Sequence, residues 1–239
     1  MKFTTIATDA FQKFQLNAGI LMTEFDPANP TVDRAKIFAA TSGGASFTAT
    51  PTFIDFGEDV DNVPANTKEL KILDSIEAVM SGTLKTVDTI VAKRLMAAAD
   101  INPNTGKVTP RADLLQSDYT DLWWVGDYSD KNTGNNAGFM AIHLINALST
   151  GGFSLQPNDK GKGDFSFTFT GHYSINDMTV VPYEVYIRAG EAEQYTYTEV
   201  TPEGTENPSE EGWYELSGTE YVLTTDTTVD EEKTYYERS

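Results

Sequence analysis

Alternation of apolar and polar side chains is the main pattern in the first 188 residues, and it predicts β-strands. In the stretch Leu70–Leu84 the even positions are mostly apolar and the odd positions mostly polar, with Asp74 as the exception. The stretch Asp164–Ile175 has the same period of two, with Phe165, Phe167 and Phe169 on one face and His172 on the polar face. Both stretches are therefore expected to be half-buried strands.

Three more segments are assigned to strands. Tyr183–Ile187 alternates clearly, and Ser46–Phe56 is rich in Thr and Phe, although its Pro51 requires a sheet edge or a bulge. The stretch Phe139–Leu148 also fits one face of a helix. The turn-like Ser149–Gly152 that follows it favours a strand.

One segment has the spacing of a helix. Between Thr86 and Ala99, apolar residues recur at steps of three and four. Thr86 or Asp88 can cap its start, and the turn-forming residues Asn102–Gly106 are expected to stop it. The first part of the chain is thus predicted to be mainly β: an antiparallel sandwich or barrel with one flanking α-helix.

Charge is unevenly distributed along the chain, which indicates two parts. The 239 residues include 36 acidic and 17 basic side chains, which gives a net formal charge of -19. Residues 189–239 carry 14 acidic and two basic residues, a net of -12, so the first 188 carry only -7. This shift predicts a domain boundary between residues 188 and 189.

The acidic segment 189–239 contains an internal repeat. Tyr197–Thr201 leads to Trp213–Glu215, and Tyr221–Thr225 leads likewise to Tyr235–Glu237. Each copy is read as a strand, a loop and a strand. The segment is therefore predicted to be a small β appendage made of tyrosine-rich hairpin repeats.

Composition also excludes several classes of function. The acidity argues against binding to nucleic acid or to anionic membranes, since both need clustered Lys and Arg. The chain has no cysteine, which excludes disulfides, thiolate zinc sites and a cysteine nucleophile. No apolar run is long enough to span a bilayer, and the N-terminal stretch lacks the pattern of a secretory signal.

The sequence contains only weak candidates for a chemical site. Asp100–Gly106 resembles a calcium loop but lacks the glycine and the glutamate that such a loop needs, so a turn is favoured. His143 and His172 lie in no nucleophile pattern, and the glycine clusters at 43–44, 151–152 and 160–163 fit turns. The pair Trp123–Trp124 could stack on a sugar but favours a core or a subunit interface. We predict no catalytic, cofactor-binding or metal-binding residue and no enzyme.

Four segments together resemble the major tail protein, or tail tube protein, of long-tailed bacteriophages that infect Gram-positive hosts. The resemblance covers residues 7–188, and the four segments that carry it are Ala7–Gly19, Phe47–Asp59, Asn66–Lys71 and Phe165–Tyr173. It implies a β-sandwich subunit that forms hexameric rings, which stack into a hollow tube in the virion tail after assembly in the host cytoplasm. The implied partners are further copies of the chain, a tape measure protein in the lumen, and tail terminator and distal tail proteins at the ends. DNA would pass through without specific binding, and no membrane is involved.

The resemblance also implies an extended hairpin loop for contact between rings. The best candidate is the acidic loop 57–67, whose expected contact residues are Gly57, Glu58, Asp59, Asp61, Asn62, Asn66 and Thr67. An ordinary solvated hairpin is the alternative. Carboxylates in the lumen would repel DNA, and residues 189–239 are expected on the tube exterior.

Two other classes of function stay open. One is a carbohydrate-binding β-sandwich module in which Trp123, Trp124 or Trp213 stacks on sugar rings. The other is a glycosidase with paired carboxylates.

Overall fold

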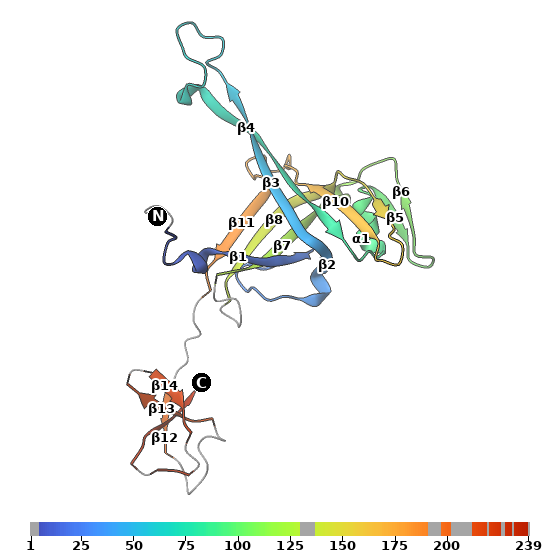
Figure 1. Ribbon diagram of the computed structural model, residues 1–239. Coiled ribbons are helices and arrows are strands. Elements are labelled where there is room, and N and C mark those ends of the chain that lie inside the picture. The colour runs from blue at the N-terminus through green and yellow to red at the C-terminus, as the bar shows by residue number, and fades with distance from the viewer. Residues whose placement is uncertain are drawn as a thin grey trace. The chain divides into compact units, whose positions relative to one another are not determined.

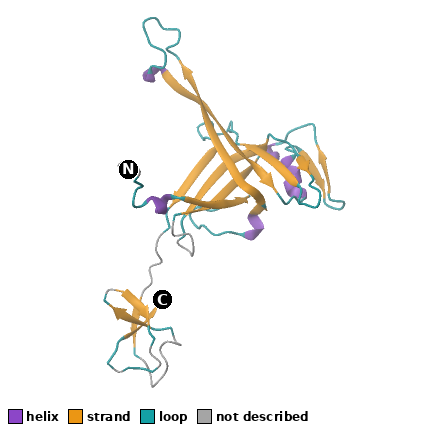
Figure 2. Cartoon of the chain, in the orientation of Figure 1, coloured by secondary structure: helices purple, strands orange, loops and turns teal. Residues whose placement is uncertain are grey.

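The structure is a computed structural model that describes residues 5–129, 137–190, 197–201, 212–218, 220–225, 228–230 and 232–238. By its internal contacts the chain divides into two units, Met1–Glu191 and Ala192–Ser239. The division lies three residues beyond the boundary predicted from charge. Strands make up most of the regular structure in both units (Figure 2).

The first unit contains eleven described strands and one described α-helix, supplemented by short 3₁₀ turns. The strands are β1 (Gln15–Met22), β2 (Ile37–Ala39), β3 (Thr41–Asp55), β4 (Lys71–Leu84), β5 (Ala99–Asn102), β6 (Lys107–Pro110), β7 (Thr120–Tyr128), β8 (Phe139–Ser149), β9 (Ser154–Gln156), β10 (Asp164–Thr170) and β11 (Tyr183–Arg188). The helix is α1 (Thr89–Leu95). The 3₁₀ turns are Ala10–Lys13, Arg34–Lys36, Lys68–Leu70 and Gln116–Asp118.

The main sheet is antiparallel and has the strand order β2-β1-β7-β8-β10-β4-β3, with β9 paired to β10 and β11 paired to β8. Strand β8 belongs to both halves of this sheet. Its first six residues pair with β11, whereas Leu148 and Ser149 pair with β10. The sheet folds at β8, so that β3 and β4 cross over β7 and β8 (Figure 1). The expected mainly β fold with one helix is confirmed.

Two apolar clusters lie on opposite faces of the β1-β7-β8 layer. The larger cluster fills the space between this layer and the β10-β4 layer, and α1 adds Val91 and Leu95 to it. The smaller cluster lies on the other face, where Phe25 packs against Trp123 and Phe139. We call this second face the outer face of the β7-β8 layer. Successive residues of β7 alternate between the two clusters, as the period of two requires.

Several strand predictions are confirmed by these clusters. Ala78, Met80 and Leu84 of β4 are buried, as are Phe167 and Phe169 of β10. The ambiguous stretch at 139–148 is a strand. Pro51 lies in β3, which is an edge strand of the sheet. A proline is tolerated in an edge strand because its missing N–H can face the open side, where no neighbouring strand needs it.

The predicted helix Thr86–Ala99 is too long. It starts at the expected cap, since the Asp88 carboxylate accepts a hydrogen bond of 2.7 Å from the Val91 amide. It ends at Leu95, because Ala97 adopts a left-handed conformation with φ of 63°. The stretch Asn102–Gly106 does not stop this helix but forms the turn of the β5-β6 hairpin.

Two other predictions need correction. Strand β10 ends at Thr170, not Ile175, and at the next residue, Gly171, the chain passes so close to Pro182 that a Cβ would lie 2.5 Å from the Pro182 carbonyl oxygen. His172 therefore follows the strand instead of alternating along it. The glycines at 43 and 44 are not a turn between strands but a bulge within β3, with φ of 76° and 80°.

The second unit is a four-stranded antiparallel sheet of β12 (Tyr197–Val200), β13 (Tyr214–Ser217), β14 (Glu220–Leu223) and β15 (Tyr235–Arg238). Each repeat contributes two of these strands, as predicted. The order β12-β15-β13-β14 places the last strand of the second repeat between the two strands of the first. Tyr235 is fully buried, with Trp213 packed 6.0 Å away between ring centroids. The repeats thus share one small core.

Candidate functional site

The β3-β4 hairpin is the most conspicuous feature of the first unit. Strands β3 and β4 pair from Thr41–Leu84 at one end to Asp55–Lys71 at the other. Near β10 they belong to the sheet, but their far ends extend well beyond it and carry the loop 57–67 at the tip (Figure 1). A sheet segment of only two strands has no second layer to bury its side chains.

Apolar side chains nevertheless line the far end of this hairpin. Phe53 pairs with Leu73, and each is 50% exposed. The next pair, Ile54 and Ile72, points to the opposite face, with exposures of 42% and 51%. Phe56 is exposed as well. We call Phe53, Ile54, Phe56, Ile72 and Leu73 the apolar stem. Both of its faces present apolar surface to solvent, which marks an interaction surface more often than an isolated exposed side chain does.

The base of the tip loop is fixed by one carboxylate. The Asp55 side chain accepts hydrogen bonds from the amides of Gly57 and Asn66, at 2.9 and 2.7 Å. These two bonds hold the pKa of Asp55 below its usual value. The Lys71 ammonium donates to the Asn66 side chain at 3.0 Å, and the Thr67 hydroxyl donates to the Pro64 carbonyl at 2.7 Å.

The seven contact residues predicted in this loop therefore fall into two groups. Gly57, Asn66 and Thr67 shape the base of the loop and are positioned by Asp55 and its neighbours. Glu58, Asp59, Asp61 and Asn62 are exposed at the tip, and no ion pair is found for the three carboxylates among the described residues. The apolar stem was not predicted as a contact surface, because its alternation matches that of any half-buried strand.

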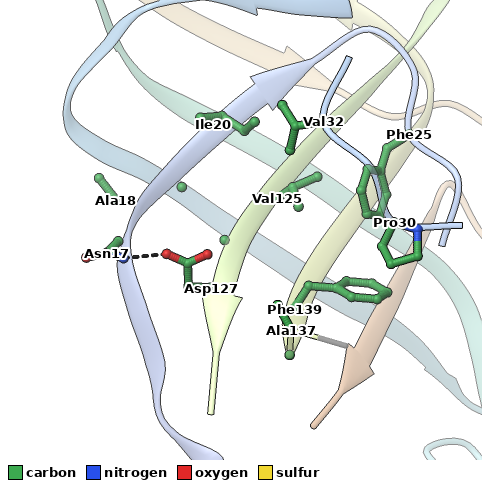
Figure 3. Close-up of a pocket in the computed structure, with 13 residues that line it drawn as sticks. Asn17, Ala18, Ile20, Phe25, Pro30, Val32, Val125, Asp127, Ala137 and Phe139 are labelled. Carbon is green, nitrogen blue, oxygen red and sulfur yellow. Dashed lines mark hydrogen bonds between the residues drawn. The ribbon is translucent and has the colours of Figure 1, made fainter. Parts of the chain in front are cut away.

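A cavity of about 500 Å³ opens on the outer face of the β7-β8 layer. Figure 3 shows Ile20, Val125 and Phe139 on the strands and Phe25, Pro30 and Val32 on the loop that follows β1, all around this cavity. At one end the Asn17 side chain donates a hydrogen bond to the Asp127 carboxylate. The cavity is thus mainly apolar with one polar end.

A bulge in β1 shapes the side of this cavity. The pairing of β1 with β7 shifts between Leu16 and Ile20, and Gly19 there has a φ of 68°. The indole of Trp124 fills the space that a side chain at Gly19 would need, since a Cβ would lie 2.6 Å from the ring. Its Nε1 donates to the Ala18 carbonyl at 3.0 Å. The tryptophan thus stabilises the bulge from the core side.

Both tryptophans of the Trp123–Trp124 pair are buried, and their interpretation as core residues is confirmed. Trp124 belongs to the larger cluster and Trp123 to the outer-face cluster. Neither presents an open ring face on which a sugar could stack.

Several strands of the main sheet have an unpaired edge among the described strands, and β2, β3, β9 and β11 each pair with a single neighbour. Strand β3 is the last strand of the order, and β11 pairs only with β8. On the interior face of β11, Val185 and Ile187 are exposed. Open edges with free backbone groups can accept a further strand from another chain.

The two histidines have different surroundings. His143 lies between Asp121 and Glu184 and stacks on Trp123, with ring centroids 3.9 Å apart. His172 packs edge-on against Tyr119, and its Nδ1 lies 3.2 Å from the Asn146 carbonyl. No serine is hydrogen-bonded to either ring among the described residues. Within the same residues, no group of three or more His, Asp or Glu side chains is arranged to hold a metal ion.

Neither unit contains, in its described part, a helix with the length and apolar character needed to cross a membrane. In comparisons with known proteins, no family model matches the chain and no curated protein matches it significantly.

Proposed function

We propose that this chain is a structural subunit that assembles with copies of itself into the tail tube of a long-tailed bacteriophage. The observation that carries the proposal is the apolar stem of the β3-β4 hairpin. Its five side chains are about half exposed in a single copy, on a hairpin too thin to bury them. A neighbouring copy would remove this surface from water.

The unpaired edges of the sheet support the same assembly. β3 and β11 carry free backbone groups at different places in the fold. An interface that joins two different patches of the same subunit is heterologous, and it produces a closed ring when the rotation between copies closes. Hexameric rings that stack through the hairpin are the arrangement that the sequence resemblance implies.

The remaining parts of the proposal concern what the tube contains and carries. The net charge of -7 in the first 188 residues suits a lumen through which DNA slides without binding, and a tape measure protein would occupy it before ejection. The net charge of -12 in residues 189–239 would repel strongly if packed into the lumen. We therefore place this segment on the tube exterior, in the virion tail.

Deletion of the tip loop tests the proposal. Removal of Glu58–Asn66 should block tube growth but leave the fold intact, since the loop lies beyond the last paired residues of the hairpin. Negative-stain electron microscopy measures the tubes, and analytical ultracentrifugation measures the rings. The fluorescence of the buried Trp123 and Trp124 verifies that the variant is folded. Tubes of normal length from the deletion variant would contradict the role of the loop, and a wild-type protein that stays monomeric at all concentrations would contradict the proposal itself.

A further inference from the structure

Strand β11 is an edge strand that is packed mainly on one face. It pairs with β8 from Tyr183–Leu144 to Arg188–Phe139. On the face opposite to the outer face, Tyr183 packs against Phe47. Val185 and Ile187 on the same face are 43% and 58% exposed. Beyond its backbone pairing with β8, the strand is therefore held mainly by the side chains of its outer face.

Those outer side chains meet a cluster centred on His143. The Glu184 carboxylate lies 3.2 Å from His143 Nδ1 and also accepts a hydrogen bond of 2.6 Å from the Tyr186 hydroxyl. On the other side of the ring, Asp121 of β7 lies 3.1 Å from His143 Nε2. The ring is stacked on Trp123 with an angle of 5° between the planes. His143 thus joins three neighbouring strands.

The positions of the two carboxylates determine which form of the histidine fits. A neutral imidazole has one N–H donor and one lone pair, so one of its nitrogens would point a lone pair at a carboxylate about 3 Å away. Only the doubly protonated ring is attracted to both Asp121 and Glu184. The contact with Asp121 is mainly a charge interaction, because the buried Nε2 has no well-aligned hydrogen-bond acceptor among the described residues.

The titration behaviour of the cluster agrees with this geometry. Burial works against the charge of His143, but its contacts with Asp121 and Glu184 outweigh burial and raise the pKa of the histidine. The contact with His143 lowers the pKa of Asp121, and the Tyr186 hydroxyl and His143 lower that of Glu184. The other charged group packed here is Arg94 of α1, whose guanidinium donates to the Asp121 carbonyl at 2.9 Å.

We propose that His143 is a pH-dependent clamp for the edge strand β11: the doubly protonated ring bridges Asp121 and Glu184, and its loss of a proton releases β11 from the sheet by local opening. This inference does not depend on the proposed tail function. Because the pKa of His143 is raised in the folded state, the stabilisation is complete below the unfolded value of about 6.5 and is lost as pH rises through the folded value. At the acidic end it is lost as pH falls through the lowered pKa values of Asp121 and Glu184.

Hydrogen exchange of the full chain tests the clamp. Exchange rates are measured from pH 5.5 to 9.5 and corrected for the intrinsic pH dependence of amide exchange, with the amides of β4 as the internal reference. Protection of the β11 amides should fall several-fold relative to β4; the effect is moderate because the Asp121 and Glu184 side chains are nearly half exposed and solvent weakens their attraction to the charged ring. In His143→Gln this additional pH dependence should disappear.

Nuclear magnetic resonance of the histidine rings gives a second measurement. The chain has two histidines, so the His143→Gln spectrum assigns the His143 signal. Its titration midpoint should coincide with the loss of β11 protection, and Glu184→Gln should move both to lower pH. Glu77→Gln, on the exposed part of β4, is the matched control and should move neither. A β11 protection profile that is the same in wild type and Glu184→Gln, or a His143 midpoint at or below 6.5, would overturn the inference.

Discussion

The apolar stem gives the sharpest test of assembly. The change is the double variant Phe53→Ser, Leu73→Ser, which removes the facing pair on one side of the hairpin. Burial of a whole Phe or Leu side chain contributes about 1.5–3 kcal/mol, and half of each side chain is already covered in the single copy. An interface that covers the other half therefore gains about 1 kcal/mol from each, or about 2 kcal/mol for the pair.

This free energy sets the size of the expected effect. A loss of about 2 kcal/mol per contact corresponds to a roughly 30-fold weaker association. The critical concentration for polymer formation should rise by about the same factor. Sedimentation of polymer over a dilution series measures this concentration, and urea denaturation shows whether each monomer remains folded. The halves of the two side chains that are already covered contribute by the same arithmetic within the monomer, so we expect its free energy of unfolding to fall by up to about 2 kcal/mol.

The matched control replaces two leucines outside the hairpin whose exposed fractions are close to those of Phe53 and Leu73. Leu114→Ser, Leu115→Ser alters side chains that are 46% and 45% exposed in the segment between β6 and β7. We expect this control to leave the critical concentration within about threefold of wild type, a difference of less than about 1 kcal/mol. An unchanged critical concentration in the folded stem variant, or an equal rise in the control, would refute the role of the stem.

Two further predictions concern the core and the charge. Gly126→Ala should lower the free energy of unfolding by about 1–3 kcal/mol, because its Cβ would lie 2.6 Å from the buried Trp124 ring. Gly163→Ala should cost less, because the nearest atom to its Cβ would be the tip of the exposed Leu155 side chain at 3.2 Å and the next, the Gln156 carbonyl oxygen, lies at an ordinary contact distance of 3.7 Å. Urea titration that finds the two variants equal would contradict this explanation. The assembled tube should bind double-stranded DNA weakly at moderate salt, as measured by fluorescence anisotropy, because its charge is negative. Tight binding would contradict the model of a passive lumen.

Alternation in the sequence was sufficient to predict strands at β4 and β10, whereas β8 also needed the turn-like Ser149–Gly152 that follows it; the apolar residues of all three face a core formed by the same chain. The same pattern was misleading in the apolar stem. Phe53 and Ile72 alternate as buried residues do, but no second layer in the described part of the chain covers them. Periodicity shows which residues share a face. It does not show whether that face is covered within the subunit or by another molecule.

Boundaries that depend on tertiary contacts could not be predicted. The helix ends through a left-handed alanine, Ala97, although glycine or asparagine is the usual signal for such an end. Strand β10 ends where Gly171 meets Pro182, eleven residues later in the chain.

The clamp around His143 depends even more on topology. Glu184 lies 41 residues from the histidine in sequence, and only the placement of β11 beside β8 brings the two together. Local patterns contain no information about such a contact.

The slender form of the β3-β4 hairpin also has a mechanical consequence. A two-stranded ribbon resists stretching along its strands, but it twists and bends more readily than a wide sheet supported by a second layer. If successive rings are joined through these ribbons, each joint is compliant in bending while the rings themselves stay rigid. The polymer would then curve by small changes in angle at many joints, and its channel would stay continuous.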